Sequence, residues 1–199
     1  MTGHEQSERT EVRWLLLEAL YEARMGPLSE NVLAGEIAEA GYDVARGDIQ
    51  RDLQHLERRG LIEADRTPPS GWRANISALG VDVVEYAAAP PTGVYRPEGT
   101  MTVQTRQTRE ARWRILQTLA IGMPMPTSER TVHAAVSDVE LPVTEAAIRR
   151  EMCYLQALGL VTVFDDRPVW RAELTADGVD IHEFQVDAPP GIDRPPPYH

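Results

Sequence analysis

Apolar residues occur at helical spacing in the first segment of the chain. Val12, Leu16 and Leu20 follow one another every four positions, so they fall on one face of an amphipathic helix. We expect this helix over residues 10–24, with the Thr10 side chain as its N-cap and the Gly-Pro pair that follows as its end.

The pattern after this helix predicts two more helices, two strands and a last helix. A short helix is expected after Ser29, and residues 46–59 are expected to form a helix with Ile49, Leu53 and Leu56 inward. The remaining features, in order, are a helix stop at Gly60, strands at 61–64 and 72–76 around a tight loop at 68–71, and a helix that Ser77 caps. This order is typical of a winged helix-turn-helix domain, which is mainly α with a small β-wing.

The sequence of the first half recurs in the second half. Arg13-Trp14 recurs 99 positions later as Arg112-Trp113, and the Trp-Arg-Ala run that starts at Trp72 recurs 98 positions later at Trp170. One register held over so many positions indicates a tandem duplication of a unit of roughly 90 residues. Two copies are too few for a solenoid, so we expect two tandem winged-helix domains.

Composition divides the chain further. Pro, Gly and Thr are concentrated between the two copies, and Pro is concentrated again at the end, which predicts segments without regular packing. The expected organisation is a flexible N-terminus at 1–9, winged-helix domain 1 at 10–86, a linker at 87–108, winged-helix domain 2 at 109–186 and a Pro-rich tail at 187–199.

Three sequence features recur in both halves and resemble a known family. They are the Arg-Trp pair of the first helix, the run Ile-x-Arg-x-x-x-x-Leu-x-x-x-Gly-Leu of the third helix, and a Gly-Val-Asp motif followed by Pro-Pro and Arg-Pro. In these features each half resembles the small winged-helix proteins of Mu-like prophages, often labelled ArsR-like, which are single units. The resemblance implies a winged-helix fold and a phage or prophage origin. The cysteine pair of metal-sensing ArsR proteins is missing, so metal-responsive repression is not expected.

The charged residues exclude several kinds of chemistry. The 199 residues carry 20 basic and 31 acidic side chains, and every basic residue is Arg, so no lysine is available for a P-loop or a Schiff base. A single Cys excludes an internal disulfide and Cys-clustered zinc sites. The five histidines show no metal-ligand spacing. We therefore expect no enzymatic activity, no cofactor and no metal.

The net charge of −11 argues against binding to DNA phosphates, but the charged side chains of the third helix of the first half are not spread evenly around it. On a helical wheel its outward side carries Arg and Gln, which read guanine and adenine edges, while Asp48, Asp52 and Glu57 lie nearer the buried edge. The candidate DNA-binding residues of domain 1 are Gly47, Arg51, Gln54, His55 and Arg58, with Arg66 and Arg73 in the wing.

The third helix of domain 2 presents different residues at the same positions. They are mostly small or apolar, which suits packing against another protein better than contact with phosphate. The candidate protein-interface residues are Ala146, Arg150, Cys153, Tyr154 and Ala157.

The leading hypothesis is a phage-derived winged-helix protein that binds double-stranded DNA or regulates transcription, with domain 1 more competent than domain 2. The alternative is an acidic adaptor that has lost DNA binding and engages a host or phage protein. We expect a monomeric pseudo-dimer or a homodimer. The polar N-terminus and the lack of a long apolar run predict a cytoplasmic protein with no membrane partner.

Overall fold

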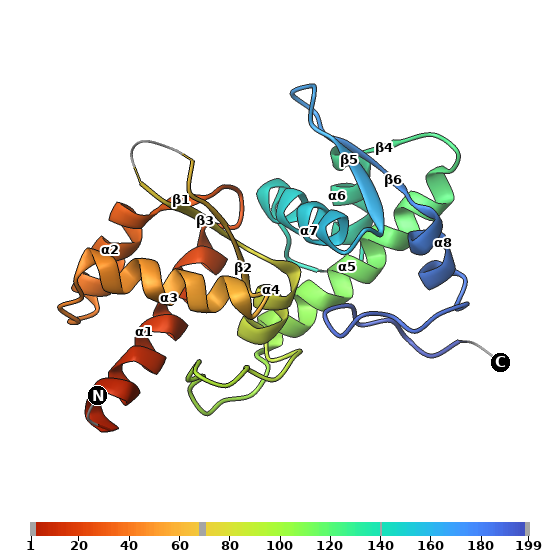
Figure 1. The fold of residues 1–199 in the computed structure, drawn as a ribbon. Helices are drawn as coiled ribbons and strands as arrows, with labels where there is room; N and C mark the ends of the chain where they lie inside the picture. The colour runs from red at the N-terminus through yellow and green to blue at the C-terminus, as the bar shows by residue number, and fades with distance from the viewer. Residues whose placement is uncertain (1–2, 68–70, 140, 198–199) are drawn as a thin grey trace. The chain divides into compact units, whose positions relative to one another are not determined.

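The chain folds into two compact units, and unit 1 ends at Thr100 where unit 2 begins at Met101 (Figure 1). The computed structural model describes residues 3–67, 71–139 and 141–197, so the predicted loop at 68–71 lies almost wholly outside the described residues. In this part of the chain, both units are mainly helical and each has a three-stranded antiparallel sheet. This confirms the prediction of a mainly α chain with small β elements.

Unit 1 has four helices and three short strands in its described residues. They are α1 (Gly3–Glu22), β1 (Leu28–Ser29), α2 (Glu30–Glu39), α3 (Arg46–Arg58), β2 (Ile62–Asp65), β3 (Arg73–Ile76) and α4 (Ala78–Val84). The strand order is β1-β3-β2, so Ala74 of β3 pairs with Leu28 on one side and with Ala64 on the other. The two-residue strand β1 was not predicted, because it is too short to show an alternating pattern.

Helix boundaries in unit 1 follow local capping chemistry at most positions. Ser29 Oγ accepts a hydrogen bond from the Val32 N–H, and Ser77 Oγ accepts one from the Gly80 N–H, which confirms both predicted N-caps. Gly60 follows α3 with a φ of 71°, a conformation that favours glycine. The predicted cap at Thr10 is wrong: α1 begins seven residues earlier, at Gly3.

Thr10 lies inside α1 because the residues before it also form helix. Its hydroxyl donates to the carbonyl of Ser7 at 2.7 Å, a bond within the helix. The predicted flexible segment 1–9 is thus helical from Gly3 onward.

Three helices and the sheet enclose the core of unit 1. Leu16 of α1, Leu33 of α2, and Ile49, Leu53 and Leu56 of α3 have no exposed surface. The inward residues predicted for α3 are therefore buried, which fixes the face that this helix turns to solvent.

Unit 2 repeats the element order of unit 1. Its elements are α5 (Val103–Gly122), β4 (Thr127–Ser128), α6 (Glu129–Ser137), α7 (Glu145–Ala157), β5 (Val161–Phe164), β6 (Arg171–Leu174) and α8 (Ala176–His182). The strand order β4-β6-β5 places Ala172 between Thr127 and Val163, and Thr175 caps α8 as Ser77 caps α4. The likeness between the halves therefore extends from sequence to topology.

The Pro-rich segments pack on the units they follow. We call residues 87–97 strap 1 and residues 187–197 strap 2. Val94 is buried in strap 1 and Ile192 in strap 2, and the Tyr95 N–H donates to the Thr10 carbonyl at 3.1 Å. The expectation that 87–108 and 187–199 lack packing is wrong for these residues, and residues 103–108 are helical in α5.

An arginine in each strap holds it against the end of the preceding helix. The Arg96 guanidinium donates to the carbonyls of Val83 and Ala88 at 3.0 and 2.7 Å. In unit 2 the Arg194 guanidinium donates in the same way to the carbonyls of Ile181 and Val186, each at 2.8 Å. These bonds give a structural role to the repeated Arg-Pro motif, because they tie each strap to the last turn of the preceding helix and to the segment just after it.

A second arginine joins three segments of each unit. In unit 1, Arg13 of α1 donates through Nε to Asp52 of α3 at 2.7 Å and through Nη1 to the carbonyl of Gly93 at 2.8 Å. In unit 2 the same groups recur as Arg112, Glu151 and the carbonyl of Gly191, with distances of 2.7 and 2.9 Å. Arg112 is fully buried, so its charge depends on these partners.

Removal of the Arg112 side chain tests this arrangement. Arg112→Ala leaves the Glu151 carboxylate buried without its cation, so we expect unit 2 to lose about 3–5 kcal/mol of unfolding free energy. Urea denaturation of the full chain measures the loss, and hydrogen exchange of residues 103–182 assigns it to unit 2. Arg114→Ala is the matched control, because its pair with Glu110 is partly exposed and contributes at most about 0.5 kcal/mol. Equal losses in the two variants contradict the prediction.

A buried glutamate begins the second helix of each unit. Glu129 of α6 accepts bonds from the Arg149 guanidinium at 2.5 and 2.6 Å and from the Trp170 N–H at 3.1 Å. The bond from Arg149 is the largest influence and, against the effect of burial, holds the pKa of Glu129 below its usual value. Glu30 has the same position in unit 1, where it pairs with Arg46 and Gln50 of α3.

The lowered pKa of Glu129 predicts that acid reduces the free energy of unfolding of unit 2. Because the folded pKa of Glu129 lies below its unfolded value near 4.5, its stabilisation is present above that pH and disappears as the pH falls through the folded value. In Glu129→Gln the stability of unit 2 is lower at neutral pH and falls less steeply below pH 4.5. The melting temperature of unit 2 between pH 3 and 7 measures the effect. Glu183→Gln, at the exposed end of unit 2, is the control. The same dependence of melting temperature on pH in the two variants contradicts the prediction.

Candidate nucleic-acid interface

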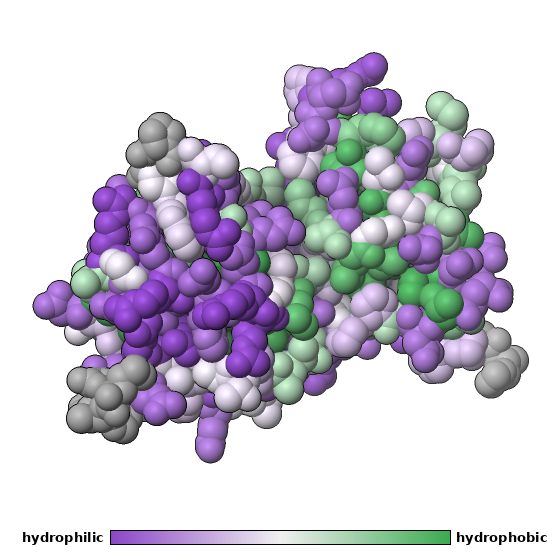
Figure 2. All heavy atoms as spheres, in the orientation of Figure 1, coloured by the Kyte–Doolittle hydropathy of each residue, from purple (hydrophilic) through white to green (hydrophobic). Residues whose placement is uncertain are grey.

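The outward side of α3 brings together four of the residues predicted to contact DNA. Gly47, Arg51, Gln54 and Arg58 are all exposed, and Figure 2 shows hydrophilic side chains gathered over this helix. The Arg58 Nε donates only to the carbonyl of Gln54, at 3.3 Å, and within the described residues no carboxylate pairs with it. Arg58 and Gln54 are thus available to an external partner.

The acidic residues of α3 are held by arginines. Asp52 is 1% exposed and accepts bonds from Arg9 at 2.9 Å and from Arg13 at 2.7 Å. Asp48 pairs with Arg51 and is about one-third exposed. Asp52 is therefore withdrawn from the outward side, whereas Arg51 already has a carboxylate partner that a phosphate would have to replace.

The β2–β3 hairpin carries the two predicted wing arginines, and one of them reaches α3. Arg66 pairs with Glu57 of α3, and its guanidinium lies 4.6 Å from the centre of the Trp72 ring. Arg73 is exposed on β3, opposite Asp65 in the register of the sheet. Both arginines are accessible, although each has an acidic neighbour.

His55 and its counterpart Tyr154 do not join the outward groups. His55 is half-buried beside strap 1, where a Cβ on Gly93 would lie 2.9 Å from its Nε2. Burial, helped by the charge of Arg13, lowers the pKa of His55, so the ring is neutral at pH 7. Tyr154 is 4% exposed under the Arg112 guanidinium, 3.7 Å from the ring centre. Neither side chain therefore lies with the exposed residues of its helix: His55 is half-buried beside Gly93, and Tyr154 is buried under Arg112.

The corresponding side of α7 is small and nearly neutral. Ala146 and Ala157 are exposed, while Arg150 and Cys153 are half-buried. Arg149, the other arginine of this helix, is held by Glu129. Apart from the buried Tyr154, the structure thus places the predicted interface residues on one surface that has little capacity to bind phosphate.

Cys153 is the cysteine of this surface, and its environment makes it unreactive. Burial raises the pKa of the thiol, and the charges of Asp165 and Glu151 raise it further. Because the thiolate is the nucleophile, we expect iodoacetamide at pH 8 to modify Cys153 at least about tenfold more slowly than the urea-unfolded chain. The rate in the folded chain should still be rising above pH 9, because the folded thiol loses its proton only above its ordinary pKa. Equal folded and unfolded rates contradict this.

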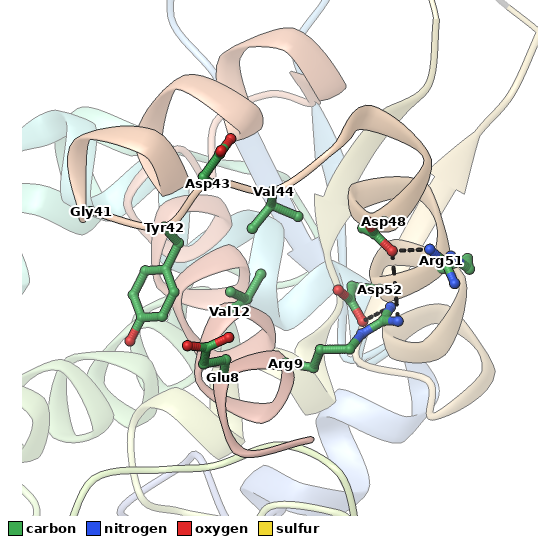
Figure 3. Close-up of a pocket in the computed structure, with 10 residues that line it drawn as sticks. All are labelled: Glu8, Arg9, Val12, Gly41, Tyr42, Asp43, Val44, Asp48, Arg51 and Asp52. Atoms are coloured by element: carbon green, nitrogen blue, oxygen red, sulfur yellow. Dashed lines mark hydrogen bonds and ion pairs between the residues drawn. The ribbon is translucent and has the colours of Figure 1, made fainter. Parts of the chain in front are cut away.

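A groove lies beside the outward side of α3 (Figure 3). It has a volume of about 560 Å³ and is formed by the N-terminal half of α1, the turn between α2 and α3, and the first turns of α3. Its lining residues are Glu8, Arg9, Val12, Gly41, Tyr42, Asp43, Val44, Asp48, Arg51 and Asp52. The sequence did not predict the groove, because one wall consists of α1 residues that were expected to be flexible.

Three findings bear on function beyond this geometry. Neither known family models nor curated proteins include a match to the chain. None of the helices in the described part of the chain combines the length and apolar character of a bilayer span. Nor do three His, Cys, Asp or Glu side chains among the described residues come together as metal ligands.

Proposed function

We propose that each unit is a winged helix-turn-helix domain and that unit 1 binds double-stranded DNA as part of a regulatory protein. The order α2, turn, α3 and β2–β3 hairpin supports the winged-helix assignment, with α3 as the recognition helix and the hairpin as the wing. The resemblance of each half to small winged-helix proteins of Mu-like prophages supports a phage-derived regulator.

The observation that carries the proposal is the outward side of α3. Gln54 and Arg58 are exposed one helical turn apart, and the glycine at position 47 allows close approach of a DNA backbone near the helix start. Gln and Arg side chains recognise adenine and guanine in the major groove. Arg66 and Arg73 lie where a wing contacts phosphates and so supply position rather than sequence information.

The acidic charge of the chain reduces its affinity for DNA that lacks the right base sequence. With a net charge of −11, the long-range field repels DNA and weakens non-specific binding. To bind a phosphate or a base, Arg51 must break its ion pair with Asp48. Arg51 therefore contacts DNA only where the new bonds compensate for the loss of that ion pair. A protein of this kind depends on base contacts more than on general electrostatic attraction.

A second candidate function is a protein adaptor, and one observation favours it. The end of α5 and the turn that follows it expose three large apolar side chains: Ile121, Met123 and Met125 are 87%, 51% and 70% exposed. Exposed apolar groups of this size are typical of protein contacts. Under this alternative unit 2, with its neutral α7 surface, makes the contact and DNA binding is absent.

Selection of bound duplexes from a random DNA pool, followed by titration at several salt concentrations, tests the proposal on the full chain. Gln54→Ala should cost about 1–3 kcal/mol of discrimination at one base pair. Arg73→Ala should weaken binding to all sequences and reduce the slope of log K against log salt by about 0.9.

The matched control is Arg150→Ala, which removes the counterpart of Arg51 from α7. We expect it to leave DNA affinity unchanged. Failure to enrich any duplex at low salt rejects the proposal in favour of the adaptor, and an equal loss in Arg150→Ala and Arg51→Ala rejects the assignment to unit 1.

A further inference from the structure

The groove in Figure 3 contains a buried carboxylate oxygen without a partner. Asp52 is 1% exposed, and its Oδ1 accepts the bonds from both Arg9 and Arg13. Its Oδ2 is also buried, and among the described residues it has no hydrogen-bond partner. Figure 3 shows this oxygen directed into the hollow between α1 and the turn before α3.

An oxygen in this position favours a donor from outside the chain. A buried polar atom left unsatisfied lowers the stability of the folded state, and a charged one lowers it more. Buried acceptors in proteins are rarely left in this state. A ligand that places an N–H group against Oδ2 recovers this energy, so the groove is prepared for a donor.

The charge of the lining favours a cation. Four carboxylates line the groove, those of Glu8, Asp43, Asp48 and Asp52, against the two guanidinium groups of Arg9 and Arg51. Asp43 is exposed at the rim and, in the described part of the chain, pairs with no cation. The field in the groove therefore attracts a positive group.

The remaining lining favours a ligand with an apolar body. Val12 and Val44 face the same hollow as the Asp52 carboxylate, and the Tyr42 ring stands at its edge (Figure 3). The Tyr42 hydroxyl donates to Glu11 at 2.6 Å, which fixes the ring. A short alkyl chain would cover the two valines while its charged end reached Asp52.

Unit 2 shows that this lining is not a requirement of the fold. At the positions 99 residues later, Glu8 is replaced by Gln107, Asp43 by Pro142 and Asp48 by Ala147. The counterpart of Tyr42 is Leu141, which is buried. The second copy keeps the buried acid that binds the arginine but not the acidic groove around it.

We propose that this groove binds a small organic cation, an alkyl amine or alkyl guanidine, whose N–H group donates to Asp52 Oδ2. The alkyl chain lies on Val12 and Val44, and the Asp43 carboxylate attracts a second charge. This proposal does not rest on DNA binding, although Arg51, one of the proposed DNA contacts, also lines the groove.

Agmatine, which carries an amine and a guanidinium on a four-carbon chain, is the probe. Titration into the full chain, followed by two-dimensional amide NMR, should give saturable shifts confined to residues 8–12 and 41–52. Choline is the control ligand, because its quaternary ammonium has no N–H donor; we expect no saturable shifts.

Three variants complete the test. Asp52→Asn should weaken agmatine binding about tenfold or more, because a charged hydrogen bond is lost. Since this change also disturbs Arg9 and Arg13, Asp43→Asn on the exposed turn serves as the variant that preserves the fold, with an expected loss of about threefold. Glu36→Gln on the exposed side of α2 should change nothing. Absence of saturable binding, equal shifts with choline, or unchanged affinity in Asp43→Asn overturns the proposal.

Discussion

Each unit depends on one arginine that joins its first helix, its third helix and its strap. Arg13 and Arg112 donate to an acid of the third helix and to a backbone carbonyl of the strap at once. In unit 2 the charge lies wholly inside the protein, where the Glu151 carboxylate and the Gly191 carbonyl compensate for its removal from water. The same contact determines which side chains of the third helix of unit 1 face solvent. Asp52 is buried and His55 is half-buried beside the strap, whereas Gln54 and Arg58 are exposed.

The two copies share this frame and differ at their surfaces. Unit 1 keeps charged side chains along α3 and around its groove, whereas unit 2 has alanine at several of the same positions and a half-buried thiol. Core and strap contacts restrict substitution because each side chain has several partners, while an exposed position has few. The two units thus combine one architecture with two chemically distinct faces, which is the basis for assigning them different roles.

Much of this fold could be predicted because its signals are local. Ser29, Ser77 and Thr175 cap helices within three residues, and the spacing of Ile49, Leu53 and Leu56 fixes the buried side of α3. The straps could not be predicted, since the bond between Arg13 and Gly93 joins residues 80 positions apart and prolines alone indicate only irregular backbone. The partial burial of His55 beside Gly93 was missed for the same reason, because a helical wheel shows one helix and not the segments packed against it. The groove was missed for a related reason: α1 continues past Thr10 to residues that supply Glu8 and Arg9.

The strap has a further consequence for how such a chain can arise. Because Tyr95 bonds to Thr10 and Asp193 to Arg109, the last segment of each unit returns to the first turns of its own first helix. A fold whose two ends meet can be copied head to tail without disturbing its interior, since the new junction falls outside the packed region. Here the junction needs only the few residues between strap 1 and the Thr102 cap of α5. The closed unit is thus a module suited to gene duplication, which leaves each copy able to change its surface while the other keeps the original one.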